Sequence, residues 1–328
     1  MKQLCIRADS NRVIVLICSS RAARVQDWMF SHNCGRDTVI LAFGGGVMGD
    51  LCGYVAAGYM RGIPFIQLPT SFLAMVDSSI GGKTGIDTPA GKNLLGAFHR
   101  PLAVLIDLSL LLTLPQRELC NGMAESIKAG LIASAELFEL MEQNADALLK
   151  DKDLALLAEV VRRSVAIKAH VVLNDEREAG LRSILNFGHS IGHAIEALSL
   201  PHLLHGECVA IGMMEEIILA RGYGLVGSGE LRRVDNILRA FSLPTRVPPH
   251  LSPKALVDKM SIDKKVRGHA RFNEVCASMA TRFMAHFVLF VHFFFFSQWT
   301  EQERQEGAGV ADGHWFGEEC AQIHHDGS

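Results

Sequence analysis

The sequence lacks several features that would define a class of protein by themselves. Its eight cysteines are scattered without a Cys-x-x-Cys pair, so we expect neither a thiolate–zinc site nor a disulfide framework, and the thiols indicate a cytosolic protein. The formal net charge is only −3, so no overall field favours nucleic acid or an anionic membrane. The longest apolar run, residues 283–296, is shorter than the roughly 20 residues that span a bilayer. We therefore expect no membrane anchor.

Apolar content is ample, with 49% of the 328 residues hydrophobic. A β-branched run at 37–43 ends in three glycines, and an apolar-periodic stretch follows at 47–59, which predicts strand, turn and helix. Residues 62–70 and 102–108 predict two further buried strands. Continuous apolar strands that alternate with helices favour a parallel sheet covered on both faces.

The pattern changes after residue 115 and becomes helical over 118–150, 154–172 and 207–221. We therefore expect an α/β N-terminal domain (residues 1–112) and a mainly α-helical C-terminal domain (113–272). Residues 273–328 hold the aberrant apolar segment and a charged tail that we expect to be disordered. A cleft between two such domains is a usual place for a ligand.

Two glycine-rich stretches suit an anionic ligand. The turn FGGGVMGD (43–50) follows a predicted strand and opens a helix, so its backbone and the helix N-terminus could meet a pyrophosphate; a tight packing turn explains it equally well. The stretch 76–93 contains Asp77, Lys83, Lys92 and Asn93 among its glycines. We interpret it as a mobile loop for a phosphorylated ligand, with a solvated surface loop as the alternative.

Histidines crowd the stretch 185–207 and suggest a metal site. His189 and His193 are spaced i,i+4 on one face of a predicted helix, and His205 follows in LLHGE. Glu125 lies on another predicted helix, with Lys128 one turn later. Catalytic zinc takes three imidazole or carboxylate ligands, and these three histidines with Glu125 allow four different trios. His202 has no helical partner and is interpreted as a solvated loop residue.

The segment 175–186 leads directly into the histidine cluster. It places Glu178, Arg182 and Asn186 at i, i+4 and i+8, and Lys168 precedes it on a predicted helix. A solvated salt-bridge stripe is the simpler interpretation. Its continuity with the histidines favours a wall that faces a substrate.

Five motifs in order, namely GGGVMGDLCGYVAAGYMRG, VDSSIGGKTGIDTPAGKNLLGAF, NGMAESIKAG, DEREAGLRSILNFGHSIGHAIE and LHGECVAIGM, resemble the 3-dehydroquinate synthase family over about residues 25–272. The pattern is especially similar to the synthase domain of pentafunctional arom proteins. The resemblance implies a Rossmann-like NAD-binding domain, a helical metal-binding domain and a cytoplasmic homodimer. It also implies an NAD- and metal-dependent (Zn²⁺ or Co²⁺) lyase of the shikimate pathway. That enzyme converts 3-deoxy-D-arabino-heptulosonate 7-phosphate into 3-dehydroquinate and phosphate.

The resemblance also implies roles for individual residues. It makes Glu125, His189 and His205 the metal ligands, and Glu178 and His193 the catalytic acid/base candidates. The implied substrate contacts are Arg61 (across a dimer interface), Asp77, Lys83, Asn93, Asn121, Lys128, Lys168, Arg182, Asn186 and Lys264. The implied cofactor contacts are Gly45, Gly46, Val47, Asp50, Thr70, Ser71, Lys92, Thr113 and Glu118.

The two ends depart from the family pattern. Early strands and a segment that binds the adenosine half of NAD have no counterpart before residue 25, and an apolar run follows residue 272. We therefore expect weak NAD binding and little activity. The alternatives are a cyclase acting on sedoheptulose 7-phosphate or glucose 6-phosphate, a metal-dependent polyol dehydrogenase, and a non-catalytic relic or dimerising domain. Lys168, Arg182 and Asn186 favour a substrate with a carboxylate, and hence the dehydroquinate reaction.

Overall fold

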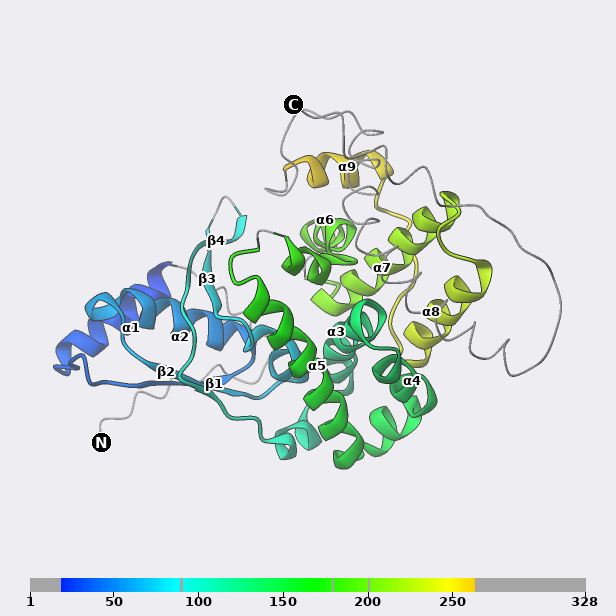
Figure 1. Cartoon of the computed structure of the whole chain (residues 1–328). Coiled ribbons are helices and arrows are strands. Elements are labelled where there is room, and N and C mark those ends of the chain that lie inside the picture. The colour runs from blue at the N-terminus through cyan, green and yellow to red at the C-terminus, as the bar shows by residue number, and fades with distance from the viewer. Residues whose placement is uncertain (1–18, 89–90, 179, 200, 263–328) are drawn as a thin grey trace, which may run out of the picture.

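The computed structural model describes residues 19–88, 91–178, 180–199 and 201–262. An α/β half lies beside a helical half, as Figure 1 shows, and this confirms the predicted fold class. The boundary predicted at residue 112 falls within the 3₁₀ segment η3 (Leu108–Thr113), which precedes the first long helix of the helical half. Lys264, the apolar run and the charged tail lie outside the described residues.

The sheet of the α/β half has three parallel strands. They are β1 (Ile40–Gly44), β2 (Phe65–Pro69) and β5 (Ala103–Val104), in the order β1-β2-β5. Between β1 and β2 the chain crosses over through helix α2 (Gly46–Gly58) and the turn η1 (Tyr59–Arg61). The third predicted strand, at 102–108, pairs over two residues only.

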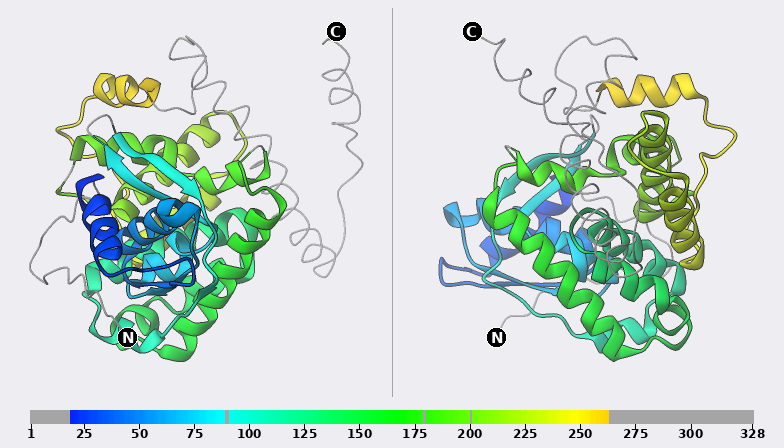
Figure 2. Two further views of the ribbon diagram at one scale, coloured as in Figure 1. Left: turned by 90° about the vertical axis from the view of Figure 1, so that its left-hand side faces the viewer. Right: turned by 45° about the vertical axis from the view of Figure 1, so that its right-hand side comes forward.

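One face of this sheet carries its core. Val55 and Leu51 of α2 pack with Phe65 of β2 and with Met29 of helix α1 (Ser19–Ser31). On β1, Leu41 and Phe43 are 57% and 56% exposed. Coverage on both faces, which the apolar strands predicted, is therefore not found within the described part of the chain (Figure 2).

The described residues of the stretch 76–93, which exclude 89 and 90, lie mostly in regular structure, so the prediction of a loop was wrong for them. The stretch contains the end of a π-type turn, η2 (Ala74–Ser78), then strand β3 (Lys83–Thr88) and the start of strand β4 (Gly91–Phe98), which pair antiparallel. Two glycines face each other in this ladder at Gly85 and Gly96, and a Cβ on Gly96 would overlap the carbonyl oxygen of Thr84. These glycines permit close strand contact and do not mark flexible backbone.

The helical half is assembled around a buried central helix, α3 (Gln116–Ala133). Around it lie α4 (Ala135–Gln143), η4 (Ala147–Asp151), α5 (Leu154–Asn174), η5 (Leu181–Asn186), α6 (His189–Ser199), α7 (His205–Gly222), α8 (Ser228–Ala240) and α9 (Pro253–Ile262). The predicted helical stretch 118–150 divides at Ser134, whose hydroxyl accepts from the Leu137 amide and starts α4. Within the described residues, none of the helices combines the length and apolarity needed to cross a membrane.

Candidate metal and substrate site

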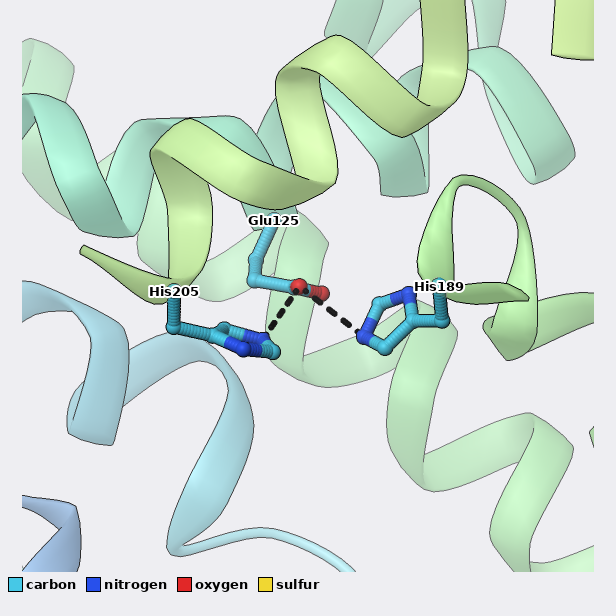
Figure 3. Close-up of side chains that lie close together, drawn as sticks. All are labelled: Glu125, His189 and His205. Atoms are coloured by element: carbon cyan, nitrogen blue, oxygen red, sulfur yellow. Dashed lines mark ion pairs between the residues drawn. The ribbon is translucent and has the colours of Figure 1, made fainter. Parts of the chain in front are cut away.

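Three potential metal ligands meet where α3, α6 and α7 converge. Glu125 lies in the middle of α3, whereas His189 and His205 are the first residues of α6 and α7. One carboxylate oxygen of Glu125, Oε1, is 3.4 Å from Nε2 of His189 and 3.4 Å from Nε2 of His205. Figure 3 shows both rings directing these nitrogens at the carboxylate. Segments 80 residues apart in the chain therefore supply one donor cluster.

Close helix packing sets the positions of the two histidines. Gly188, immediately before α6, has φ +73°, which favours glycine. A Cβ on Gly212 of α7 would overlap the carbonyl oxygen of Gly188, and a Cβ on Gly206 would overlap that of Asn121. The Gly206 amide donates to Oδ1 of Asn121 at 2.6 Å. Small residues thus let α7 approach both α3 and the start of α6.

The cluster also contains a buried cation. Lys128 forms an ion pair with Oε2 of Glu125, and both side chains are buried. Burial alone would raise the pKa of Glu125, but Lys128, His189 and His205 together hold it well below its usual range. Burial and the Lys128 charge lower the pKa of His189. Burial would also lower the pKa of His205, but its contacts with the carboxylates of Glu125 and Glu196 outweigh that effect and raise it to about 10.

The donors fit a divalent transition metal. Oε1 of Glu125 is buried and makes no hydrogen bond within the described part of the chain. His189 turns Nδ1 to the carbonyl oxygen of Phe187 at 3.0 Å, which leaves Nε2 free to act as a ligand. The donor atoms of Glu125, His189 and His205 lie within 4.8 Å of one another, as do those of a second group formed by His193, Glu196 and His205. Two imidazoles and one carboxylate match a three-ligand zinc site with an open position.

His193 stands beside this cluster. Its ring centroid is 5.1 Å from that of His189 and 6.1 Å from that of His205. The i,i+4 spacing on α6 therefore brings two rings together as predicted. His202 lies in an exposed turn.

A second group of polar residues lies between α5, η5 and the β3–β4 hairpin. Glu178 accepts from Nζ of Lys83 at 2.5 Å and from Nδ2 of Asn186 at 2.7 Å. The expected helical face at 178–186 is wrong, because Glu178 has φ +60° and only 181–186 form a helix, of the 3₁₀ type. Glu178 and Asn186 nevertheless meet. The backbone bends where the i, i+4, i+8 spacing predicted one straight helix.

Of the three cations that the family resemblance assigns to a substrate carboxylate, Lys128 is the partner of Glu125, and Lys168 and Arg182 are also largely shielded from solvent. Nζ of Lys168 is 2.6 Å from Oδ1 of Asp77 and 2.5 Å from its carbonyl oxygen. Burial lowers the pKa of Lys168, with Asp77 opposing. Arg182 is buried and donates to the carbonyl oxygens of Glu176 at 2.6 Å and Gly81 at 3.4 Å. A solvated salt-bridge stripe, the simpler interpretation, does not describe Arg182.

Other predicted substrate residues lie elsewhere or are held by the protein itself. Arg61 is exposed on η1, and the 13-residue helix α2, about 20 Å long, separates it from the glycine turn. The side-chain amide of Asn121 donates to Glu118 at 3.2 Å and accepts from the Gly206 backbone amide, so Asn121 joins α3 to α7. Asn93 has φ +50° on β4, and its backbone amide donates to Oδ1 of Asp87.

The predicted cofactor residues cluster around the N-terminus of α2. Gly45 and Gly46 begin this helix, and a Cβ at these positions would approach Ser71 Oγ (3.3 Å) and Ser78 Oγ (2.7 Å). Thr70 donates its amide to the Gly44 carbonyl. Val47 is exposed, and Asp50 is one turn into the helix. Burial raises the pKa of Asp50 to about 7, with the Lys168 charge opposing.

The remaining cofactor residues are more dispersed. Thr113 Oγ1 donates to the Leu110 carbonyl in η3, and Glu118 accepts from Asn121. Nζ of Lys92 on β4 is 2.7 Å from Oε1 of Glu196 on α6. Lys92 thus lies next to the histidine cluster as well as in the α/β half.

Sequence reasoning missed two carboxylates in this region. Glu196 is i+7 from His189, on the same face of α6, so the helical spacing could have indicated it. Glu216 on α7 accepts from the backbone amides of Gly188 (at 2.8 Å), Ser190 and Ile191, and in this way caps the start of α6. Nothing in the local pattern points to Glu216, because its partners lie 25 to 28 residues upstream.

The fold and the donor set define a class: two-part α/β and α-helical proteins with a glycine turn and a metal-type centre. Solved structures share this architecture. A 2-epi-5-epi-valiolone synthase from Streptomyces hygroscopicus, with NAD⁺ and Zn²⁺ bound, is 35% identical at a TM-score of 0.71, covering 74% of this chain and 68% of that one. A 2-deoxy-scyllo-inosose synthase complexed with carbaglucose-6-phosphate, NAD⁺ and Co²⁺ is 28% identical at a TM-score of 0.71, covering 78% and 69%.

Family comparison is more specific. The model of the 3-dehydroquinate synthase N-terminal part matches residues 18–121, and that of the C-terminal part matches 122–266. The chain belongs to the 3-dehydroquinate synthase family. It is 50% identical over 264 residues to the pentafunctional AROM polypeptide of Schizosaccharomyces japonicus and 47% identical over 274 residues to that of Schizosaccharomyces pombe. Each match covers 76% of this chain, and the chain spans 17% of the length of these relatives.

Proposed function

We propose that this chain is a 3-dehydroquinate synthase that converts 3-deoxy-D-arabino-heptulosonate 7-phosphate into 3-dehydroquinate and phosphate with NAD and a divalent metal. The observation that carries the proposal is the buried Oε1 of Glu125, which makes no hydrogen bond in the described structure and faces Nε2 of both His189 and His205. Family membership and the metal and NAD⁺ of the two solved relatives support it.

In this proposal Glu125, His189 and His205 hold Zn²⁺ or Co²⁺. Bound there, the metal would supply Lewis acidity to a substrate hydroxyl, and NAD would accept and return a hydride. The glycine turn at Gly45 and Gly46 would admit the pyrophosphate of NAD, because its backbone lies at a helix N-terminus. The full set of roles implied by the family resemblance is carried over as part of the proposal.

The cations around the cluster are suited to an anionic substrate. Lys168 and Arg182 are the proposed carboxylate grip, since a buried guanidinium can exchange its carbonyl partners for a bidentate carboxylate. Lys83 would contact phosphate. Glu178, already within hydrogen-bond distance of Lys83 and Asn186, would hold or move a proton, with His193 as the second candidate.

The domain boundaries, a homodimer that uses Arg61 and a cytosolic location stay predictions and belong to the same proposal. The other activities of the pentafunctional relatives are not assigned to this chain, which corresponds to a small part of them.

Phosphate release by the purified chain tests the proposed function. Because NAD binding is expected to be weak, the assay uses excess NAD with Zn²⁺; we expect slow release from 3-deoxy-D-arabino-heptulosonate 7-phosphate and much less from sedoheptulose 7-phosphate or glucose 6-phosphate. His189→Ala should abolish release, and the matched control His202→Ala, in an exposed turn, should retain it. A preference for sedoheptulose 7-phosphate would replace the dehydroquinate reaction by the alternative cyclase. Metal binding without release from any of the three substrates would support a non-catalytic chain.

A further inference from the structure

Glu196 connects three elements at the edge of the metal-type centre. It lies on α6 with 9% of its surface exposed. Its Oε1 accepts from Nζ of Lys92 on β4 at 2.7 Å. Its Oε2 is 3.4 Å from Nδ1 of His205 at the start of α7. The proposed reaction gives Glu196 no role, yet its carboxylate contacts one of the three donor residues.

The ring of His205 has a carboxylate at each nitrogen. Nε2 faces Oε1 of Glu125 at 3.4 Å, and Nδ1 faces Glu196. An imidazole that binds a metal through Nε2 carries its proton on Nδ1, and an acceptor at Nδ1 fixes both that tautomer and the ring plane. Glu196 is placed as such an acceptor.

His189 has the equivalent arrangement with a different acceptor. Its Nδ1 lies 3.0 Å from the carbonyl oxygen of Phe187, and its Nε2 faces the same oxygen of Glu125. Both rings therefore present Nε2 to one point and Nδ1 to an oxygen. A backbone carbonyl orients the first ring, and an ionised side chain orients the second.

Resting on the proposed metal centre, we propose that Glu196 is a positioning residue for His205. It holds the tautomer in which Nδ1 is protonated, directs Nε2 at the metal, and raises the ring's basicity as a ligand. Lys92 keeps the Glu196 carboxylate in place through its other oxygen. Because Lys92 belongs to the β3–β4 hairpin, this contact connects the α/β half to a ligand of the helical half.

A rival use of the same side chain is a second metal site made of His193, Glu196 and His205, whose donor atoms also lie within 4.8 Å of one another. A metal on Nδ1 of His205 would displace the Nδ1–H that donates a hydrogen bond to Glu196, so this arrangement and the positioning role exclude each other. The ammonium of Lys92 on Glu196 favours the positioning role, because it occupies one carboxylate oxygen with a cation.

Cobalt binding to the full chain tests the proposal without reference to turnover. Metal-free wild type, Glu196→Ala, Glu196→Gln and the control Glu215→Ala are titrated with Co²⁺, and the visible absorption band of the ion gives the dissociation constant. Glu215 is a half-buried carboxylate on α7. We expect about 10- to 100-fold weaker binding in Glu196→Ala and a smaller loss in Glu196→Gln, whose amide oxygen can still accept. Glu215→Ala should stay within about twofold of wild type. Thermal unfolding of the metal-free proteins checks that each variant is folded.

Proton NMR of the Co²⁺-loaded wild type gives a second test that needs no variant to fold. Two exchangeable ring N–H signals shifted by the cobalt are expected, from Nδ1 of His189 and Nδ1 of His205. Only one such signal would overturn the proposal, as would equal Co²⁺ affinity in Glu196→Ala and Glu215→Ala. Two Co²⁺ ions per chain, with the second lost in Glu196→Ala, would make Glu196 a ligand and also overturn it. Wild type that binds no Co²⁺ would refute the centre itself, whereas Co²⁺ binding with the expected pattern but no phosphate release would refute the proposed activity alone.

Discussion

Replacing Lys128 by methionine should destabilise the metal-free protein strongly while leaving its metal affinity intact or improved. Lys128 is 4% exposed and Glu125 is 2% exposed, and the two form an ion pair on α3. Methionine keeps the volume and the helix propensity of lysine, so the change isolates the charge. Removing one partner of a buried ion pair costs about 3–5 kcal/mol, because the other charge stays buried with less compensation; in the described structure, Glu125 would keep only its contacts with His189 and His205 at 3.4 Å.

The pH at which unfolding should be measured follows from the direction in which the pKa of Glu125 is shifted. Burial would raise its pKa, but the cations around it hold it below the usual value. The stability contributed by the ionised pair is therefore present above the unfolded-state pKa of about 4.3 and is lost as the pH falls through the folded-state value. At pH 7.5 the full contribution is present, so urea unfolding with a chelator at this pH measures the 3–5 kcal/mol loss.

Metal binding should restore part of the stability that Lys128→Met loses. A divalent ion beside Glu125 supplies the positive charge that Lys128→Met removes, and the variant no longer places an ammonium near the ion. Each tenfold gain in Zn²⁺ affinity returns about 1.4 kcal/mol under saturating metal. The double variant Glu125→Gln/Lys128→Met, which removes both charges, should be more stable without metal than Lys128→Met alone. A loss below about 1 kcal/mol in the single variant, or a double variant no more stable than it, would refute the reasoning.

Two further predictions follow from the structure. Asp50 has a pKa raised to about 7 by burial, so its contribution to stability is fully present below about pH 4 and is lost as the pH rises through 7. The free energy of unfolding of Asp50→Asn minus that of wild type, measured by urea unfolding, should therefore rise by about 2 kcal/mol from pH 5 to pH 8, after allowing for partial solvation. A difference that stays constant over this pH range would contradict the prediction. Gly212→Ala should cost about 1–3 kcal/mol and weaken Co²⁺ binding, because the added Cβ overlaps the Gly188 carbonyl beside His189. Gly222→Ala on the same helix, where a Cβ meets nothing within 4 Å, is the control and should do neither.

The sequence was sufficient for the elements whose pattern is local. The strand–glycine–helix unit at β1 and α2 follows from a β-branched run and helical periodicity. The pairing of His189 with His193 follows from i,i+4 spacing on one helix. The metal trio was different: Glu125 and three histidines left four combinations open, because spacing along the chain does not say which helices cross. Only the family resemblance singled out the trio that the structure brings together.

The errors have a shared physical cause. Residues 76–93 were interpreted as a loop because glycines are usual in turns, but Gly85 of this stretch lies on β3 opposite Gly96 of β4 and is required by strand contact. The straight face expected from Glu178 to Asn186 fails at one residue with positive φ. In both places tertiary contacts decide the backbone, and a single sequence does not display them.

The placement of His189 and His205 at the first positions of two helices has an electrostatic consequence. A helix N-terminus carries a partial positive charge, so α6 and α7 both direct positive potential at the centre, and Lys128 adds a full charge. A dication could bind there only against repulsion unless carboxylates balance it. Glu125 and Glu196 contact the imidazoles directly and supply this negative charge. In the proposed function, charge is thus offset inside the centre by Glu125 and Glu196. The substrate's anionic groups would then be bound by Lys83, Lys168 and Arg182, which exchange their present partners Glu178, Asp77 and the backbone carbonyls for them.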